Sequence, residues 1–223
     1  MHAALMVLAM IVILESGVPS AVQRRALAAT VRMRVGDRTT ATAVVIGRKD
    51  GELYLLTADH AIDGPDTTAL RFEFFADGKA EPAFALKGAE AALRRPVADF
   101  ALLKVAVPEA RTVAILPLIP PGKHAKRFPF AALSVGCSRG EAPTGARETI
   151  AAKRWAVRRV DDVAFFWQAE NAQQRGRSGG PLVDVEGRII GIAAATALGK
   201  GYSVHASEIH AALKTEGFEW LWQ

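Results

Sequence analysis

The chain lacks the residues that several classes of protein depend on. Among 223 residues it has one cysteine, Cys137, so no disulfide can form within it and packing alone must stabilise the fold. It has no low-complexity tract and no repeat of solenoid length, which excludes solenoid and collagen-like architectures. Half of its residues are apolar and 23% are charged, the usual balance of a globular protein with a proper core.

Long apolar runs are also scarce. The run AALMVLAMIVIL, residues 3–14, is shorter than the about 20 residues that a spanning helix needs, and it is typical of the core of a signal peptide. We therefore expect residues 1–22 to be a signal peptide, with cleavage around Ser20 or Ala21, or a short N-terminal membrane anchor. The protein would then be exported, periplasmic or secreted. The alternatives are a buried first strand or a wrongly assigned translation start.

Acidic residues are too few to balance the basic ones, and the formal charge is +5. Basic residues gather at 24–25, 94–95, 123–127 and 153–159 without the interleaved aromatic pattern of a nucleic-acid-binding surface. We interpret these clusters as solvated faces with some attraction to acidic surfaces, and expect no nucleic-acid partner. Cys137 lies in the apolar run ALSVGCS, which predicts a buried, inert thiol; a catalytic cysteine is the alternative, but no supporting motif surrounds it.

What the first half contains is a succession of short strands. ATVRMRVG (29–36) and LRFEFFA (70–76) alternate apolar and polar residues with a period of two. TATAVVIG and LYLLTA, joined by the Asp-Gly turn of RKDGE, predict a β-hairpin. FALKGAEAALRR leads toward DFALLKVA, a strand that an acidic residue opens. The Pro-rich stretch at 117–121 breaks regular structure, so we place the boundary between two lobes there.

The second half repeats this style. Its strand candidates are FAALSVGCS, RETIAAKRWAVRRV, VAFFWQAE, PLVDVEGRIIGIAAAT and GYSVHA. Only SEIHAALKTEG (207–217) is typical of a helix, with Ser207 as its N-terminal cap and Gly217 as the left-handed residue at its end. Many short strands without βαβ alternation predict an all-β protein of two antiparallel barrels or sandwiches. The final FEWLWQ is expected to dock back on a barrel; the alternative is a contact with another subunit or a membrane.

The segment GRSGGPLVD, residues 176–184, is the first candidate for chemistry. A serine hydroxyl becomes a nucleophile only with a base nearby, and the base needs a third group to fix its tautomer. The glycines around Ser178 allow a sharp turn in which backbone N–H groups can surround an oxyanion. By itself, the segment is also compatible with a plain turn.

Two further residues have suitable local settings. His60 follows the apolar strand LYLLTA, which suits a general base held by a rigid element, although a lone histidine is more often structural. Asp99 opens the apolar strand FALLKV, where an inward carboxylate needs a partner such as a histidine N–H; otherwise it is a strand-start cap. The other histidines are weaker candidates: His124 lies in a basic loop, His205 in a late strand and His210 on an exposed-looking helix face.

Taken together, TADHAI, DFALLKV and GRSGGPLVD occur in the order His, Asp, Ser and resemble the trypsin-like (chymotrypsin-fold) serine peptidases, most of all their HtrA-type branch. The resemblance covers about residues 29–213. It implies two six-stranded antiparallel β-barrels with an active site between them. It also implies His60 as general base, Asp99 as its orienting carboxylate, Ser178 as nucleophile, and the N–H groups of Gly176 and Ser178 as the oxyanion hole.

The domain organisation that follows is a peptidase domain over 23–223. Its N-terminal barrel would span about 29–116, its C-terminal barrel about 122–206 and its terminal helix about 207–217. The residues after Ser178 suffice for a barrel and one helix but not for the PDZ domain that HtrA-type proteins usually carry. The loose pattern G-x-S-x-G does not indicate an α/β-hydrolase, because a strand follows Ser178 and the acid and histidine would have to come later.

The sequence departs from many secreted relatives immediately before the serine. Those enzymes have an aspartate there that pairs with a newly cut N-terminus, and Arg177 cannot do so because two cations repel. We infer that this form of zymogen activation is absent. Alternatively, Arg177 points to solvent or binds substrate.

The resemblance also implies the walls of the pocket for the substrate side chain. They are Ala172, Ala193, Ala194, Ala195 and Tyr202, which favour a small or medium apolar residue on the acyl side of the cut. The substrate would lie along 192–195 as an added β-strand.

The function expected from the sequence is that of a serine endopeptidase acting on polypeptide substrates through an acyl-enzyme, with no metal and no organic cofactor. One alternative is a catalytically silent peptidase-fold protein that serves as a binding or scaffold module. A further alternative is a basic protein that binds surfaces or nucleic acid, which would show steep salt dependence.

Overall fold

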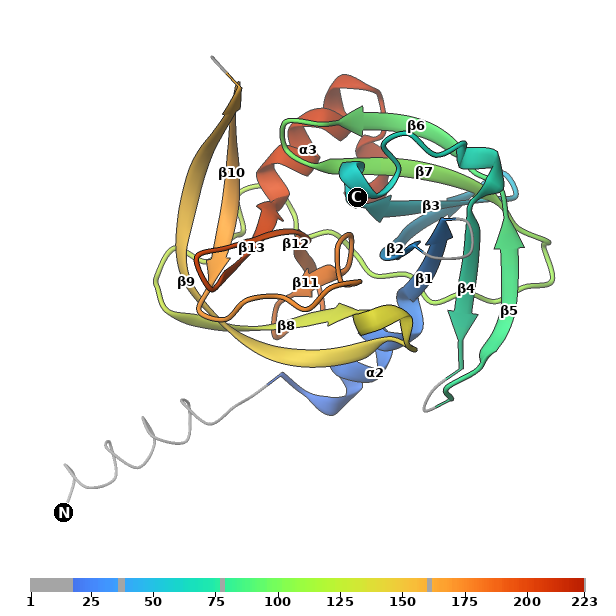
Figure 1. Ribbon diagram of the computed structural model, residues 1–223, viewed down its shortest axis with the longest axis horizontal. Helices are drawn as coiled ribbons and strands as arrows, with labels where there is room; N and C mark the ends of the chain where they lie inside the picture. The colour runs from blue at the N-terminus through green and yellow to red at the C-terminus, as the bar shows by residue number, and fades with distance from the viewer. Residues whose placement is uncertain (1–17, 36–38, 77–78, 160–161, 223) are drawn as a thin grey trace.

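The structure is a computed structural model that describes residues 18–35, 39–76, 79–159 and 162–222 (Figure 1). Residues 3–14, which carry the export prediction, lie outside this part. Strands dominate it, and two α-helices lie near its ends. The strands are β1 Thr30–Val35, β2 Thr39–Lys49, β3 Glu52–Thr57, β4 Arg71–Phe75, β5 Pro82–Lys87, β6 Glu90–Arg95, β7 Phe100–Ala106, β8 Phe130–Gly136, β9 Thr144–Arg159, β10 Asp162–Ala169, β11 Pro181–Val183, β12 Ile189–Ala197 and β13 Lys200–His205; the helices are α2 Ser20–Ala29 and α3 Ala206–Thr215.

The first half forms one antiparallel sheet in the order β5-β4-β1-β2-β3-β7-β6. The predicted hairpin is confirmed: β2 pairs with β3, and Asp50 and Gly51 turn between them with φ of 51° and 77°. Positive φ at both central residues is the mark of the tight turn that matches the twist of a hairpin, and Asp-Gly tolerates it well.

This sheet has seven strands where six were expected. The segment FALKGAEAALRR, to which the sequence pattern assigned no element, forms two strands, β5 and β6, on either side of Gly88. Gly88 has a φ of +80°, and its N–H donates to the carbonyl of Leu70, which fixes the corner. Among the described strands, β5 and β6 are the two ends of the order and no register joins them. A closed six-stranded first barrel is therefore not what the strand pairing describes.

The second half is a closed barrel of six antiparallel strands in the order β10-β13-β12-β11-β8-β9, which confirms the prediction for this lobe. The proline-rich stretch connects the two lobes, as expected. Its Leu116 N–H donates to Val45 of the sheet, and the carbonyl of Pro117 accepts from Ile189 of the barrel. The connection therefore binds to both lobes while crossing between them.

The two lobes share a hydrophobic core. Its fully buried members include Leu56 and Leu102 from the sheet and Val135 and Ile192 from the barrel. The C-terminal segment joins this core as predicted, because Trp220 stacks edge-on against Tyr54 at 4.9 Å and Leu221 is buried. The described chain thus forms the sheet first and the barrel second, and its C-terminal segment then packs against the sheet.

Helix α2 was not predicted. It packs against the barrel through buried Ala26 and Ala29, and Val18 before it is buried as well. The proposed cleavage region around Ser20 coincides with the start of this helix. No described helix has the length and apolar character needed to cross a bilayer.

Helix α3 lies close to its predicted position, but two details were wrong. Ser207 is not the cap; the ring nitrogen Nδ1 of His205 accepts the Ser207 N–H at 3.0 Å instead. His210, expected on an exposed face, is buried at 7% exposure. Both errors arise because α3 packs against β12 and β13, so the helix presents an inner face that its own pattern of residues does not show.

Candidate active site

The structure brings His60 and Asp99 together from two loops of the first lobe. His60 lies in a short 3-10 helix, Asp59–Ala61, directly after β3, and Asp99 lies immediately before β7, the strand that pairs with β3. The Nδ1 atom of His60 is 2.9 Å from Oδ2 and 3.0 Å from Oδ1 of Asp99. The backbone N–H of His60 also donates to Oδ1. Asp99 is therefore an orienting partner of the histidine rather than a simple strand cap.

Burial differs sharply between the two partners. The Asp99 side chain is 2% exposed, whereas that of His60 is 50% exposed. A carboxylate at Nδ1 selects the tautomer in which Nδ1 carries the proton, which leaves Nε2 as the acceptor. Asp99 adopts a φ of +61°, a left-handed conformation that is uncommon outside glycine, as the surrounding structure holds it in this position.

The 3-10 helix that carries His60 is itself fixed by an ion pair. Arg94 donates to both carboxylate oxygens of buried Asp59, at 2.7 and 3.0 Å, and reaches Asp63 at 3.2 Å. The hydrogen bond to Asp59 raises the pKa of Arg94, so the guanidinium stays charged. Sequence reasoning noted Asp59 only as a neighbour and Arg94 only as part of a basic cluster, because their pairing depends on the contact between distant segments.

Ser178 lies against the segment that leads to His60. Its carbonyl accepts the N–H of Thr42 at 2.9 Å. The next residue, Gly179, has a φ of +85°, and a Cβ there would lie 2.5 Å from Thr57 Oγ1 and 2.8 Å from the nitrogen of Ala58. Only glycine permits this approach, so the second lobe can press Ser178 against the end of β3, two residues before His60.

The two candidate oxyanion donors, the N–H groups of Gly176 and Ser178, point away from neighbouring hydrogen-bond acceptors. The carbonyl of Arg175 accepts the N–H of Arg139, and that of Arg177 accepts the N–H of Gly180. In a trans peptide the N–H points opposite to the preceding carbonyl, so these bonds direct the N–H groups of Gly176 and Ser178 the other way. In the described part of the chain, neither N–H donates to a backbone oxygen. Such unused donors are what an oxyanion needs.

Thr42 and Cys137 support this loop from the side. The Thr42 hydroxyl donates to the carbonyl of Gly176 at 2.7 Å and accepts the N–H of Cys137 at 2.9 Å. Gly176, with a φ of +91°, leaves no room for a Cβ beside the carbonyl of Cys137. Cys137 is fully buried, as predicted, and burial raises the pKa of its thiol to about 12, which disfavours the thiolate that a catalytic cysteine needs.

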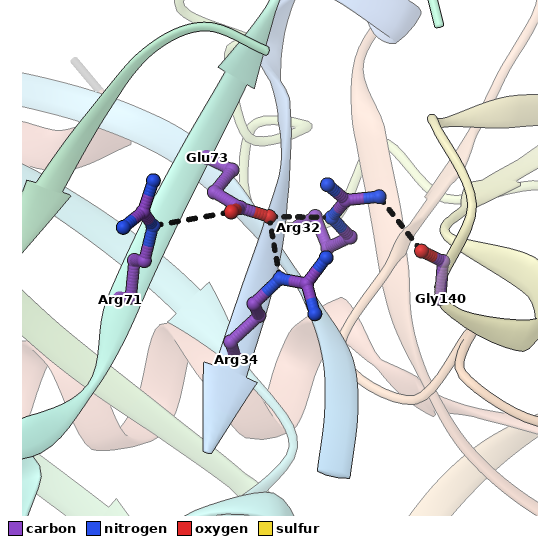
Figure 2. Close-up of polar contacts among 5 residues, drawn as sticks. All are labelled: Arg32, Arg34, Arg71, Glu73 and Gly140. Carbon is purple, nitrogen blue, oxygen red and sulfur yellow. Dashed lines mark hydrogen bonds and ion pairs between the residues drawn. The ribbon is translucent and has the colours of Figure 1, made fainter. Parts of the chain in front are cut away.

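A second support reaches the loop from the first lobe (Figure 2). Buried Glu73 accepts hydrogen bonds from three arginines, and Arg32, one of them, also donates to the carbonyl of Gly140 at 2.7 Å. Burial opposes ionisation of Glu73, but the hydrogen bonds from Arg32 and Arg34 win and lower its pKa. The contact continues through Arg139, the neighbour of Gly140, to the carbonyl of Arg175.

Arg177 is buried beneath the loop, so the alternative that it points to solvent is wrong, while a contact with substrate stays a prediction. It is 4% exposed and donates to the Ser134 carbonyl at 2.6 Å, to Ser138 Oγ at 3.1 Å and to Thr144 Oγ1 at 3.3 Å. Burial lowers its pKa. The guanidinium therefore binds strand β8 and the turn after it to the residue that precedes Ser178.

Glu148 faces the same interior. It is buried, and its Oε2 has no hydrogen-bond partner in the described chain; burial raises its pKa, while the charge of Arg177 opposes this effect. Both side chains line a cavity of about 320 Å³ beneath the loop. The remaining lining residues are Ser138, Thr144, Gly145, Ala146, Arg147, Asn171, Ala172, Gln173 and Gln174.

The predicted substrate-binding residues lie in two places. Ala172 lines the cavity of Arg177 and Glu148, which contains none of the others. Ala193 and Ala194 are buried in β12, and half-buried Ala195 pairs with Tyr202 across β13. The N–H and carbonyl of Ala193 bond to Gly180 and Gly179. Beyond this point the described part of β12 pairs with β13 alone, which leaves its other edge open.

The three remaining described histidines form a cluster away from this site. The ring of His124 lies 4.4 Å from that of His205 and 6.1 Å from that of His210. Burial lowers the pKa of all three, to about 3 for His205 and to about 4 for His210. Within the described residues, no group of three or more His, Cys, Asp or Glu side chains has a metal-binding arrangement. Sequence reasoning treated these histidines separately and missed the cluster.

Comparison with known proteins agrees with this geometry. The family model described as "Trypsin-like peptidase domain" matches residues 41–192, which contain His60, Asp99 and Ser178. The protease Rv3671c from M. tuberculosis, in its active form, is similar in structure, with a TM-score of 0.68, 18% identity, and coverage of 91% of this chain and 88% of that one.

Two further solved structures are similar. An HtrA-type protease, AlgW, solved with a tripeptide, has a TM-score of 0.68 and 22% identity, covering 89% of this chain and 62% of its own. A serine endoprotease from Yersinia pestis has a TM-score of 0.62 and 20% identity, covering 87% of this chain and 65% of its own. At these identities the structural likeness concerns the fold.

Proposed function

The chain belongs to the trypsin-like peptidase family, and we propose that it is a serine endopeptidase whose catalytic residues are Ser178, His60 and Asp99. The observation that carries the proposal is the pair of short contacts between His60 Nδ1 and the Asp99 carboxylate, 2.9 and 3.0 Å. The packing of Gly179 against Thr57 and Ala58 supports the role of Ser178, because it holds the serine beside the same segment.

In the proposed mechanism, His60 Nε2 removes the proton of the Ser178 hydroxyl as Ser178 Oγ attacks the scissile carbonyl. Asp99 holds the tautomer and stabilises the imidazolium that forms. The tetrahedral intermediate collapses to an acyl-enzyme while His60 protonates the leaving amine. Water, deprotonated by His60, then attacks the ester, and His60 returns that proton to Ser178 Oγ as the carboxylic acid product leaves.

The N–H groups of Gly176 and Ser178 are proposed to bind the oxyanion. Arg139 and Gly180 bind the preceding carbonyls and so orient both peptide planes before substrate arrives. Preorganised donors avoid reorganisation during the reaction, which is the main reason that such sites stabilise a transition state.

Arg177 is proposed to replace the activating ion pair of many secreted relatives. Its guanidinium donates to five oxygens of the chain's own interior, which belong to Ser134, Gly136, Ser138 and Thr144, and thereby holds the loop from beneath. On this proposal, the loop that carries the N–H groups of Gly176 and Ser178 needs no newly cut N-terminus to order it. The side chain at position 177 is positively charged, and its hydrogen-bond acceptors are already in place.

Polypeptides are the proposed substrates. A substrate strand would pair with the open edge of β12 beyond Ala193, and Ala195 and Tyr202 would limit the side chain on the acyl side to a small or medium apolar group. Ala172, Ala193 and Ala194 are retained as further members of this pocket. Export, with residues 1–22 as signal peptide or anchor, is likewise a proposal.

The test is covalent labelling with a fluorophosphonate probe, followed by cleavage of a peptide library. We expect the wild-type protein to be labelled and to cleave after small apolar residues. Ser178→Ala should lose both activities while its melting temperature stays close to the wild-type value, because Ser178 is half-buried and the substitution leaves the close packing of Gly179 in place. Undiminished proteolysis by Ser178→Ala, or an unlabelled wild-type protein, contradicts the proposal; the latter result fits a silent scaffold.

A further inference from the structure

Most of the exposed large apolar side chains in the described chain lie on one surface. Six such residues are exposed, and four of them form what we call the outer stripe. Its members and their exposed fractions are Phe128 40%, Trp155 65%, Val163 51% and Phe165 39%. Single exposed apolar residues are ordinary, whereas a contiguous group with a tryptophan marks an interaction surface.

The register of the β9–β10 hairpin explains why these residues share a face. Trp155 pairs directly with Phe165, so both point to the same side, and Val163 follows two residues away. The alternating residues Ala164 and Phe166 point inward and are buried. Figure 1 shows the end of this hairpin extending past the rest of the barrel. Its inner face contributes to the core, whereas Trp155, Val163 and Phe165 on its outer face stay exposed.

Phe128 extends the stripe toward the base of the hairpin. Its ring lies 5.9 Å from that of Trp167, and Trp167 lies two residues beyond Phe165 on β10. Trp167 is itself buried at 1% exposure, so Phe128 lies beside the inner end of this face, and the three hairpin residues form its outer exposed part.

Basic side chains border the stripe. The Lys153 ammonium lies 4.3 Å from the centre of the Phe165 ring, and Lys123, Lys126 and Arg127 are exposed in the loop that leads to Phe128. Two acidic residues lie near the stripe. Asp162 directly precedes Val163 and pairs with Arg159 in the strand register, and Glu208 on α3 is half-buried behind the hairpin and accepts a hydrogen bond from the backbone of Phe165. The outward charge of the stripe is thus positive.

We propose that the outer stripe docks on a membrane surface that contains anionic phospholipids. Tryptophan and phenylalanine favour the interfacial region, where the ring is partly in acyl chains, and lysine and arginine are attracted to anionic headgroups. A second copy of this chain is a poor occupant, because the same cations would face one another. The proposal does not depend on peptidase activity. In the sequence, the basic cluster at 153–159 indicates a solvated face. This interpretation does not account for Trp155, because the sequence does not reveal that this side chain points outward.

The test uses the full chain with vesicles of phosphatidylcholine alone or mixed with phosphatidylglycerol. We expect binding to the mixed vesicles, and we expect the double variant Trp155→Ser/Phe165→Ser to bind at least about tenfold more weakly, since two aromatic side chains no longer leave water. Leu198→Ser is the matched control, because Leu198 is 97% exposed in the turn between β12 and β13, outside the stripe, and should change nothing.

Charge is tested separately. Lys126→Gln/Arg127→Gln should weaken binding, while Lys87→Gln, on the opposite lobe, should not. Raising the salt from about 0.1 M to about 1 M, which shortens the Debye length from about 10 Å to about 3 Å, should weaken wild-type binding. Brominated lipids should quench the fluorescence of Trp155, and Trp155→Phe should remove that component.

Each remaining outcome overturns the proposal. If Trp155→Ser/Phe165→Ser binds like the wild type, any affinity for vesicles comes from elsewhere, including residues 3–14. Equal binding with and without phosphatidylglycerol contradicts the role of the cations. A concentration-dependent sedimentation coefficient that the double variant abolishes assigns the stripe to self-association, and capture of an acidic protein in preference to vesicles assigns it to a protein partner.

Discussion

The three clustered histidines make the protein sensitive to mild acid. His205 and His210 are 1% and 7% exposed, and burial is the largest cause of their lowered pKa values. The charges near them are cationic: Lys153 and the neighbouring imidazoles, including that of His124. The folded protein therefore keeps both rings neutral, whereas the unfolded chain protonates them near the ordinary value of 6.5.

The sign of the effect follows from proton binding. Above pH 6.5 both states hold neutral rings and these histidines make no contribution. Between pH 6.5 and the folded pKa values of about 4 and about 3, the unfolded chain binds protons that the folded protein does not, so stability falls as pH falls. At pH 5 each group has lost about 2 kcal/mol, and the pair about 4 kcal/mol, a large part of a typical stability of about 5–15 kcal/mol.

Urea denaturation followed by tryptophan fluorescence at pH 7.5 and pH 5 measures this loss. His205→Asn/His210→Gln should be less stable at pH 7.5 but should lose much less between the two pH values. Asparagine can still accept the Ser207 N–H as an N-cap. Glu73, whose pKa is lowered, contributes stability that is lost only as pH falls below its ordinary value of 4.5, outside this window. An equal loss in wild type and variant would refute the reasoning.

Three further perturbations follow from the site. Arg177→Gln should lower kcat about tenfold to a hundredfold with little change in KM, because the loop that carries the oxyanion donors loses its charged support. Arg24→Gln, at an exposed position on α2, is the control. An unchanged kcat in Arg177→Gln would contradict the proposed role of Arg177. Gly179→Ala should abolish labelling by the fluorophosphonate probe and lower the melting temperature markedly. The φ of +85° and the close approach of the Thr42 carbonyl both forbid a Cβ at this position. A melting curve like that of the wild type would contradict this packing. Glu73→Gln should lower the free energy of unfolding, measured by urea denaturation, by about 3 kcal/mol, because buried Arg32 loses its carboxylate partner. A change in this free energy that lies within experimental error would contradict the buried network in Figure 2.

Local patterns were sufficient for the features that short segments determine. The Asp50-Gly51 turn and the strand order around it follow from alternation and turn chemistry. The histidine and aspartate were recognisable because each lies at the end of an apolar strand, and strands β3 and β7 bring those ends together.

Features that depend on contacts between distant segments were missed. Gly88 turns a corner whose carbonyl acceptor belongs to Leu70 before β4, so nothing within FALKGAEAALRR itself marks the break. Arg177 has the composition of a surface residue, and only the oxygens contributed by β8 and the start of β9 make its burial acceptable. The histidine cluster likewise joins a loop, a strand end and a helix.

The return of the C-terminal segment to the first lobe has a thermodynamic consequence. Trp220 and Leu221 pack against Tyr54 and Gly47 of the sheet. The barrel is therefore attached to the sheet by the linker that precedes it and by the C-terminal segment that follows it. Separation of the lobes must break both ties and expose their shared core at once. Unfolding is therefore expected to be a single cooperative event, in which the lobe that carries His60 and the lobe that carries Ser178 lose their structure together.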